Sequence, residues 1–358
     1  MIAVAAQHIG TASAAVDAED LLSRLGCVQL DSIAAVRRSH ELVALARGVP
    51  LPTAMDLLAR RDVAVGFEGW AHAMSFIAIE LWPYFAVRRR HIRAKGWSGP
   101  AVDEGACREV RRRLAEGQEL TSGDLGGPSG QGWGSRSALK IAADWLLWTG
   151  EASCVFRRGF TRVYLCTDRA IPGPYRWDEG DDNECLRRLV AAALRALGVG
   201  TTDDIADYFR LGQSEEVEKV LHGLGVEQVM VEGWEQPAWL AVGAGANAGP
   251  VAQPVALSLF DSLIWYRPRQ ERLFGRRWLL EAYKPPAKRE FGYFGMPILT
   301  TGGLAGRVAL RCRDGRLVVE AAEWDDSLAE RQQLHVAIDR VAEWTGTTVY
   351  WQAGVDPL

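Results

Sequence analysis

The sequence lacks the arrangements of cysteine and histidine that usually bind metals or form disulfide frameworks. Its 6 cysteines never form a Cys-x-x-Cys pair, and its 6 histidines never form a His-Glu-x-x-His motif. These absences exclude a zinc ribbon, an iron–sulfur loop and a small secreted disulfide fold. We therefore expect no structural metal, no cofactor and a reducing, cytoplasmic compartment.

Long apolar runs are also missing. The first ten residues have no basic segment ahead of their apolar part, and Gln7 and His8 interrupt that part early, which argues against an export signal. Residues 239–259 are weakly polar, but they contain several glycines and two prolines, so we interpret them as a linker and not as a membrane span. The 358 residues are enough for two or three compact units.

Positive charge is not in excess overall, because 41 Lys and Arg stand against 45 Asp and Glu. That balance excludes a histone-like protein but conceals two cationic stretches. Residues 84–113 hold nine Lys and Arg against three acids, and residues 257–316 hold twelve against five. Grouped Lys and Arg suit a phosphate backbone, although a single charged run is more often a solvated helix face. Two such runs favour a shared anionic partner.

One supersecondary plan occurs three times: a helix, a short helix, a longer helix and then a two-stranded hairpin. In the clearest copy, helices are expected at 104–115 and 135–149, with a short helix and a glycine-rich loop after Thr121. The β-like runs 152–156 and 161–166 then form the hairpin. A second copy follows at about 185–242, and a weaker one occupies the N-terminus. This is the winged-helix plan.

The last part of the chain has a sequence pattern typical of β-strands. Residues 255–324 contain short β-rich runs separated by turn residues, with hairpin turns expected at 301–303 and 314–315. A helix at 327–346 stops at Gly346 and is expected to pack across this sheet. The predicted fold is therefore α+β, with three tandem winged-helix domains and a C-terminal antiparallel β-barrel. The expected domains are residues 1–82, 83–172, 173–250 and 251–358.

The winged helices themselves argue against a regulator that reads base sequence. A recognition helix needs polar and basic side chains on its exposed face to reach base edges. The helix at 214–223 is acidic, and the helix at 137–150 is mostly apolar. Both are expected to be scaffold, because a winged-helix fold does not by itself establish transcriptional control.

The most informative local feature is the segment GCVQLDSIAAVRRSHELVALARG at residues 26–48. In an extended chain Gln29 and Asp31 project to the same side, with Leu30 anchored in the core behind them. An amide can orient a water molecule, and a carboxylate can accept its proton or stabilise a neighbouring positive charge. The alternative is structural: Asp31 or Ser32 caps the next helix, and Gln29 satisfies a backbone group.

This segment, together with four further stretches, resembles the AlkZ/YcaQ type of bacterial DNA glycosylase. The other stretches are FEGWAHAMSFIAIELWP, ALKIAADWLLWTGEASCVFRRGFTRVYLCTDRAIP, FDSLIWYRPRQERLF and YKPPAKREFGYFGMPIL. The resemblance covers nearly the whole chain in matching order. It implies three winged helices with a β-barrel, and hydrolysis of the N-glycosidic bond of N7-alkylated purines, including bulky adducts and, in some members, interstrand crosslinks. The implied biological role is DNA repair or self-resistance to a genotoxin.

The resemblance assigns catalysis to Gln29 and Asp31, since these enzymes carry Gln-x-Gln or, in the YcaQ-like branch, Gln-x-Asp. The sequence departs from the family in two places. Glu41 stands where a second histidine is common after His40, and Gly69 replaces an aromatic residue. No lysine adjoins the motif, so we predict a monofunctional hydrolase without Schiff-base chemistry.

The expected partner is double-stranded DNA carrying alkylated purines, bound by a monomer that has no membrane contact. We place His72, in the WAH stretch, within an aromatic-rich helix. There we favour a hydrogen-bonded position in the core over a contact with DNA. The candidate DNA-binding residues lie beside the motif, at a wing tip and in the predicted barrel, where Pro268 is expected to leave its neighbours free to project. They are Arg37, Arg38, His40, Arg157, Arg158, Arg162, Trp265, Arg267, Arg269, Arg272, Lys288 and Arg289. The competing hypotheses are a DNA-binding regulator and a noncatalytic protein that sequesters damaged DNA.

Overall fold

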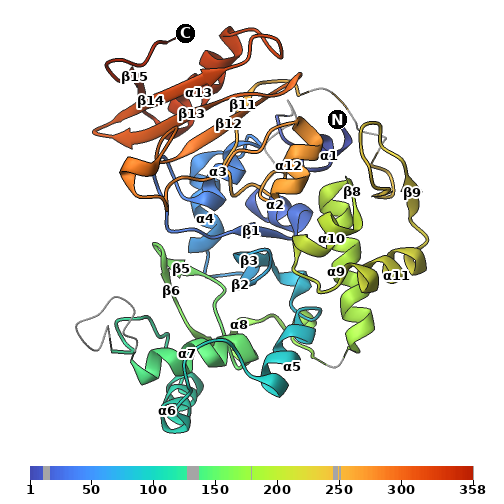
Figure 1. Ribbon diagram of the computed structural model, residues 1–358. Helices are drawn as coiled ribbons and strands as arrows, with labels where there is room; N and C mark the ends of the chain where they lie inside the picture. Colours follow the sequence, from blue (N-terminus) through green and yellow to red (C-terminus); the bar gives the residue numbers. More distant parts are fainter. Residues whose placement is uncertain (11–16, 127–136, 179, 245–248, 250, 358) are drawn as a thin grey trace. The chain divides into compact units, whose positions relative to one another are not determined.

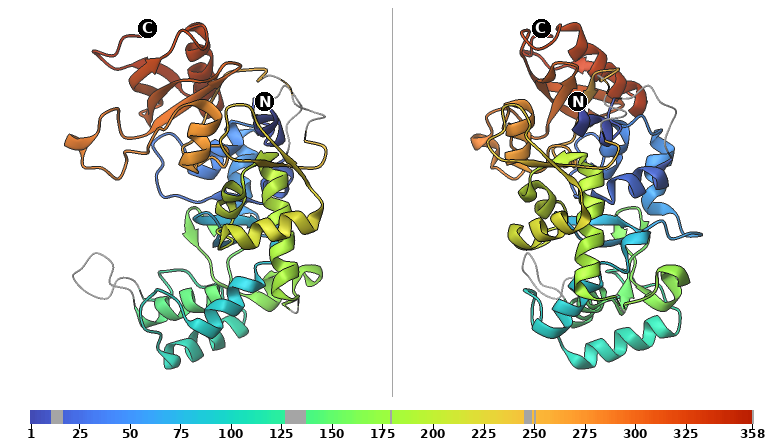
Figure 2. Two further views of the ribbon diagram at one scale, coloured as in Figure 1. Left: turned by 45° about the vertical axis from the view of Figure 1, so that its right-hand side comes forward. Right: turned by 90° about the vertical axis from the view of Figure 1, so that its right-hand side faces the viewer.

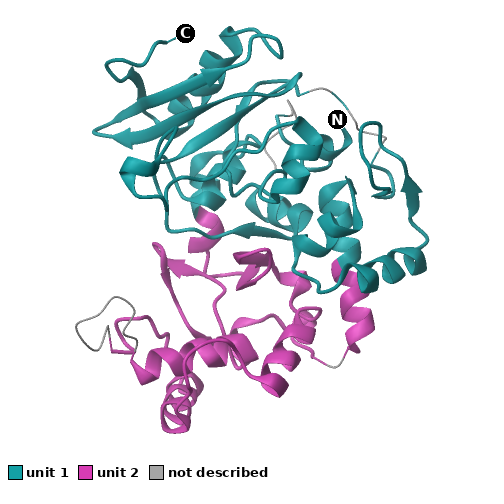
Figure 3. Ribbon diagram, viewed as in Figure 1, with its two compact units in different colours: residues 1–55, 190–358 teal, residues 56–189 magenta. Residues whose placement is uncertain are grey.

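The computed structural model describes most of the chain in two compact units (Figures 1 and 3). Unit 1 contains residues 1–55 and 190–358, and unit 2 contains residues 56–189. Unit 1 is thus built from both ends of the chain. Most of the glycine-rich loop predicted after Thr121 lies outside the described residues, which are 1–10, 17–126, 137–178, 180–244, 249 and 251–357.

The largest sheet belongs to unit 1 and has five strands, which form a curled half-barrel (Figures 1 and 2). The sheet order follows the chain: β11 (Val255–Ala256), β12 (Gly295–Thr300), β13 (Gly303–Arg313), β14 (Arg316–Trp324) and β15 (Thr348–Trp351). The turns expected at 301–303 and 314–315 are confirmed. At the second of them, Asp314 and Gly315 both take positive φ angles, 50° and 72°, as a tight hairpin turn between twisted strands requires.

The prediction of an antiparallel sheet is right for β11 to β14 and wrong for β15. Strand β15 pairs parallel to β14, with Leu317 opposite Val349. The reason is the helix α13 (Gln332–Thr345), which carries the chain back across the sheet so that β15 starts in the same direction as β14. Leu334, Ile338 and Val341 of this helix are buried in one core with β12, β13 and β14, as its apolar face predicts.

The N-terminal part of unit 1 consists of short helices and one short strand. They are α1 (Ile2–Ala6), α2 (Ala18–Leu25), β1 (Cys27–Gln29), α3 (Ser39–Leu45) and α4 (Leu51–Ala59), the last of which runs into unit 2. The fully buried Arg47 forms an ion pair with Asp261 at 2.7 Å and also bonds the Gln7 carboxamide at 2.8 Å. This contact joins the two chain segments of unit 1.

The predicted second copy of the helix–hairpin plan has the expected element order. Its members are α9 (Asp182–Leu197), β8 (Val199–Gly200), α10 (Thr202–Tyr208), α11 (Ser214–Leu224), β9 (Glu227–Val229) and β10 (Ala238–Leu240). Thr201 caps α10, and β10 pairs antiparallel with both β9 and β8. The assignment of this segment as a winged helix, and the division of the chain into four domains, stay predictions.

In unit 2, residues 66–78 form a hairpin where the sequence suggested a helix. Strands β2 (Gly66–Trp70) and β3 (Met74–Ala78) pair antiparallel, and His72 lies in the turn between them. The expectation of an aromatic-rich helix is therefore wrong: aromatic side chains in this segment pack on a pleated sheet, which they favour. The Gly69 Cβ position is 2.8 Å from the Ile77 side chain, so a larger residue there would collide with the partner strand.

The rest of unit 2 follows the predicted plan with one exception. Its elements are η1 (Ile79–Leu81), α5 (Ala86–Lys95), α6 (Glu104–Ala115), α7 (Ala138–Thr149), β4 (Ala152–Ser153), β5 (Arg157–Arg158), β6 (Thr161–Arg162), β7 (Leu165–Cys166), α8 (Thr167–Ala170) and η2 (Gly173–Tyr175). The short helix expected after Thr121 is a turn instead, because the Asp124 carboxylate accepts the Thr121 backbone N–H at 2.8 Å and closes the chain locally.

Candidate active site

The Gln29–Asp31 motif lies in unit 1, at the end of β1. The preceding helix α2 is capped by Asp17, whose carboxylate accepts the Asp20 N–H at 2.7 Å, and it ends at Gly26 in the left-handed region. That geometry lets β1 begin directly at Cys27. Leu30 is buried as predicted, whereas Gln29 and Asp31 are half-buried and reach solvent. The motif is therefore anchored by its middle residue and accessible at both polar ones.

Ser39, the first residue of α3, joins the backbones of the two motif residues. Its hydroxyl donates to the Gln29 carbonyl at 2.6 Å and accepts the Asp31 N–H at 2.9 Å. Ser39 is only 1% exposed, so water cannot replace either hydrogen bond. One buried side chain thereby fixes the spacing between Gln29 and Asp31.

The Asp31 carboxylate accepts one hydrogen bond on each oxygen. Oδ1 accepts the Ile33 backbone N–H at 2.8 Å, and Oδ2 accepts the Tyr283 hydroxyl at 2.7 Å. Partial burial and the hydrogen bond to Asp31 raise the pKa of Tyr283 above its ordinary value, so the phenol remains a donor at neutral pH. The two contacts fix the orientation of the Asp31 carboxylate.

The structural alternative for the motif does not fit this geometry. The next helix, α3, starts eight residues beyond Asp31, so neither Asp31 nor Ser32 caps it. Among the described residues, no group of the protein hydrogen-bonds the Gln29 carboxamide. The amide is thus available to a water molecule or a substrate.

The loop before α3 is braced by Glu41, the residue that departs from the family pattern. Its carboxylate accepts from the Arg37 guanidinium at 2.8 Å and from the Arg38 backbone N–H at 3.1 Å. Arg38 in turn bonds the Ser32 carbonyl through its guanidinium. His40 is 3% exposed, so its predicted contact with DNA requires a change of conformation.

Tyr283 belongs to a loop between α12 (Arg267–Phe274) and β12 that the sequence reasoning did not connect with the motif. The residue opens the stretch YKPPAKREFGYFGMPIL, which supported the family resemblance, but it follows Asp31 by 252 positions. No local pattern reports so distant a contact. The same loop contains the one-turn helix η3 (Pro286–Lys288).

Glu281 organises this loop. One carboxylate oxygen accepts the Lys284 ammonium at 2.7 Å, and the other accepts the backbone N–H groups of Glu290 and Phe291 at 2.9 and 2.8 Å. These donors lower the pKa of Glu281 to about 2, the Lys284 contact having the largest effect. These hydrogen bonds fix the shape of the loop, and Tyr283 lies between Glu281 and Lys284 in the sequence.

Two of the predicted DNA-binding residues also lie in this loop, in different environments. Lys288 is exposed. Arg289 is half-buried, donates to the Lys284 carbonyl at 3.0 Å and stacks over the Tyr293 ring at 5.0 Å. Of these two residues, Lys288 is therefore the more accessible to solvent.

The arginines near Pro268 are mostly internal. Pro268 stands in the first turn of the helix α12, where proline is well tolerated, so the expectation of an irregular barrel segment is wrong. Arg269 is 1% exposed and forms an ion pair with Asp204 at 3.0 Å, which Arg272 also bonds. Trp265 is buried as well, and Arg267 donates to two backbone carbonyls. Their environment favours a structural role over DNA contact.

The wing-tip arginines of unit 2 are likewise paired. Arg157 and Arg162 both bond the buried Glu68, whose pKa burial alone would raise, but the charges of the two arginines lower it. Arg162 also bonds Asp144 at 2.9 Å. Arg158 is exposed and bonds Glu119. Only Arg158 of this group could exchange its partner for a phosphate without uncovering a buried charge.

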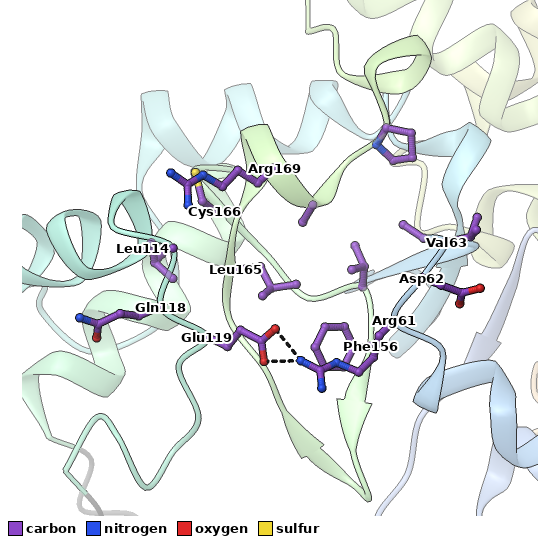
Figure 4. Close-up of a pocket in the computed structure, with 15 residues that line it drawn as sticks. Arg61, Asp62, Val63, Leu114, Gln118, Glu119, Phe156, Leu165, Cys166 and Arg169 are labelled. Atoms are coloured by element: carbon purple, nitrogen blue, oxygen red, sulfur yellow. Dashed lines mark hydrogen bonds and ion pairs between the residues drawn. The ribbon is translucent and has the colours of Figure 1, made fainter.

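Unit 2 also contains a cavity of about 450 Å³ (Figure 4). Arg61 bonds Glu119 there at 2.7 and 2.8 Å and stacks over Phe156 at 4.8 Å. Because these charges compensate each other, this cavity gives no sign of selecting a charged ligand.

Within the described ranges, no three His, Cys, Asp or Glu side chains lie close enough to hold a metal ion. The same part of the chain contains no helix with the length and apolarity needed to span a bilayer.

Two comparisons with known proteins bear on this site. A family model described as "DNA glycosylase AlkZ-like" matches residues 22–344, a range that includes the Gln29–Asp31 motif, Ser39 and Tyr283. Among solved structures, the Streptomyces sahachiroi DNA glycosylase AlkZ is similar over 98% of this chain and 98% of its own, with a TM-score of 0.64 and 16% sequence identity. At that identity the structural likeness concerns the mixed α+β fold.

Proposed function

The chain belongs to the AlkZ-like family of DNA glycosylases, and we propose that it hydrolyses the N-glycosidic bond of N7-alkylated purines in double-stranded DNA. The proposal includes bulky adducts and interstrand crosslinks, as part of DNA repair or of self-resistance to a genotoxin in the cytoplasm. The observation that supports it best is the pair of accessible polar residues, Gln29 and Asp31, held together by the buried Ser39.

The chemistry of the substrate defines what these residues must do. Alkylation at N7 leaves the purine positively charged, so the bond between C1′ and N9 breaks with the base departing as a neutral molecule. No general acid is needed. The remaining tasks are to stabilise the oxocarbenium character of the sugar and to deliver water to C1′.

Asp31 suits both tasks. Its negative charge faces the developing cation, and it accepts the proton that the water loses as the new C1′–O bond forms. Its two protein partners, the Ile33 N–H and the Tyr283 hydroxyl, hold the carboxylate in place by one hydrogen bond to each oxygen. Gln29, whose carboxamide has no protein partner in the described chain, orients that water molecule.

The same site explains why we propose a monofunctional hydrolase. The lysine nearest to the motif along the Tyr283 loop is Lys284, whose ammonium bonds Glu281 at 2.7 Å. That contact raises the pKa of Lys284, so the amine stays protonated and is a poor nucleophile. A Schiff base with the sugar is therefore not expected.

DNA contact in unit 1 is assigned to groups that flank the motif. Arg37 and Arg38 precede α3, and Lys288 and Arg289 belong to the loop of Tyr283. Of these, Lys288 is the most exposed, and within the described residues it forms no ion pair. In unit 2, Arg158 is the remaining candidate. Removing a contact between one of these residues and a phosphate should weaken binding to all DNA sequences about equally.

The test is to incubate the purified protein with duplex DNA containing N7-methylguanine or a nitrogen-mustard crosslink, and then to cleave abasic sites with alkali. Wild type should produce strand breaks, whereas Asp31→Asn should lower the single-turnover rate by roughly 100-fold or more with DNA affinity nearly unchanged. Asp339→Asn, which changes an exposed carboxylate on α13, is the matched control and should retain the wild-type rate.

Neither alternative would produce abasic sites in this assay, and a binding measurement separates the two. A sequestering protein would bind the damaged duplex, whereas a regulator would prefer one undamaged duplex sequence over others. Borohydride should trap no covalent protein–DNA adduct, and a trapped adduct would refute the monofunctional assignment. Full turnover by Asp31→Asn would refute the role of the carboxylate.

A further inference from the structure

Tyr283 is the side chain that connects a second part of unit 1 to the candidate catalytic carboxylate. Its hydroxyl donates to Asp31 Oδ2 at 2.7 Å, while 70% of the residue is exposed. The exposed residue thus holds a fixed contact through its hydroxyl.

The position of Tyr283 is imposed by its loop and not by the packing of its ring. Glu281, two residues earlier, is buried and gathers Lys284 and the backbone N–H groups of Glu290 and Phe291. Arg289 closes the loop from the other side by donating to the carbonyls of Lys284 and Glu281 at 3.0 and 3.3 Å. Five hydrogen bonds, one of them also an ion pair, thus hold the loop around Tyr283, although the tyrosine itself is exposed.

The two contacts of Asp31 are complementary. The Ile33 N–H fixes Oδ1 from the motif's own loop, and the Tyr283 hydroxyl fixes Oδ2 from the loop of residues 281–292. With one donor on each oxygen, rotation of the carboxylate breaks at least one hydrogen bond. Each oxygen still has a second lone pair, which is the pair that a water molecule at C1′ would use.

We propose that Tyr283 is a positioning residue for the hydrolysis: its hydroxyl holds the Asp31 carboxylate in one orientation. This inference rests on the proposed function, in which Asp31 accepts the proton of water. It adds a third residue to the Gln29–Asp31 pair and gives a function to the loop of residues 281–292.

Other charged groups around Asp31 are engaged elsewhere. On the side of α3, Arg37 pairs with Glu41, Arg38 bonds the Ser32 carbonyl, and His40 is buried. On the side of the loop, Lys284 pairs with Glu281, and Tyr293 lies next to the guanidinium groups of Arg289 and Arg311. Tyr283 is therefore the titratable side chain in direct contact with the carboxylate.

The experiment compares Tyr283→Phe with wild type in single-turnover excision of N7-methylguanine. The variant keeps the ring and loses only the hydroxyl. We expect the maximal rate constant to fall about tenfold, because the carboxylate loses one of two orienting hydrogen bonds. The enzyme concentration that gives half of that rate should stay unchanged, because the lost contact orients the carboxylate and does not bind DNA. The dissociation constant for damaged DNA should stay within about twofold.

The matched control is Tyr350→Phe, an exposed tyrosine of β15 that stacks on Arg316 at 5.2 Å and has no contact with the motif. It should reproduce the wild-type rate and the wild-type NMR signal of Asp31. A purely structural role of the Tyr283 hydroxyl would lower the free energy of unfolding and leave the rate of the folded protein unchanged, so the rate separates the two interpretations.

A carboxyl ¹³C NMR spectrum of Asp31 in the two proteins tests the same contact without using activity. At neutral pH the chemical shift of the Asp31 carboxyl carbon should differ between Tyr283→Phe and wild type, because the hydrogen bond to Oδ2 is lost. Equal chemical shifts together with equal excision rates would overturn the inference, as would a variant whose only defect is weaker DNA binding. If wild type excises no alkylated base at all, the proposed function fails, whereas the NMR comparison still decides whether Tyr283 holds Asp31.

Discussion

The hydroxyl of Ser39 offers the most direct test of how the motif is held. It makes two hydrogen bonds, to the Gln29 carbonyl at 2.6 Å and from the Asp31 N–H at 2.9 Å, at a site that is closed to water. Ser39→Ala leaves both backbone groups without this partner. At about 1 kcal/mol for each bond, the free energy of unfolding should fall by about 2 kcal/mol. The single-turnover excision rate of the folded variant should fall about tenfold, because Gln29 and Asp31 lose their fixed spacing.

The control for this variant is Ser153→Ala. Ser153 is also fully buried, but its hydroxyl has no hydrogen-bond partner within the described residues. Its removal should change the free energy of unfolding by less than about 0.5 kcal/mol. Urea unfolding followed by tryptophan fluorescence measures both variants, with the slope against urea concentration expected to stay constant. If the two alanine variants are equally stable and equally active, the reasoning about Ser39 is refuted.

Two further predictions concern buried carboxylates of unit 1. The pKa of Glu281 is lowered to about 2, so its contribution to stability is complete above its ordinary pKa and is lost as pH falls towards 2. The difference in free energy of unfolding between wild type and Glu281→Gln should accordingly be constant from pH 8 to pH 6 and shrink below about pH 4.5, and urea unfolding that shows a constant difference down to pH 3 would contradict this. Asp204→Asn leaves the buried Arg269 without its counter-charge and should lower stability by about 3 kcal/mol in the same assay, whereas Arg277→Met, at an exposed and loosely paired site, should have almost no effect. Equal stability of these two variants would show that the Asp204 pair is unimportant.

Local sequence signals predicted the elements of this fold well. Gly26, Gly150 and Gly346 each end a helix in the left-handed conformation, as their positions after apolar periodic segments indicated. The Asp314-Gly315 turn was predicted from its residue types, and the helix that packs on the final sheet was predicted from its end at Gly346. Each of these features depends on residues that are close together in the chain.

The predicted DNA contacts that the structure supports least involve residues with a distant partner. Arg269 and Arg272 were expected to face DNA, and they pair with Asp204, which lies more than 60 positions away in the sequence. Arg157 and Arg162 similarly meet Glu68 in the other part of unit 2. A cationic stretch in the sequence does not reveal whether its charges are already neutralised, and here most of them are.

The residues of the candidate site also differ in how far apart they lie in the sequence. Gln29 and Asp31 are two positions apart and interrupt an otherwise apolar extended run, and the family resemblance assigned them to the site. Tyr283 could not be predicted, because its hydrogen bond to Asp31 joins segments separated by 252 residues. Ser39 stands between these cases: it is near in sequence, but serine at the start of a helix ordinarily indicates a cap.

The division of unit 1 between the two ends of the chain has a consequence for biosynthesis. Gln29 and Asp31 leave the ribosome early, yet Tyr283 and the half-barrel strands that bury Ile33, Val36 and Leu42 are translated only after the whole of unit 2. At about 5–20 residues per second, the N-terminal segment waits roughly 10 to 50 seconds for these partners. A nascent chain that has not yet reached residue 283 therefore lacks both the loop that contacts Asp31 and the strands that cover Ile33, Val36 and Leu42.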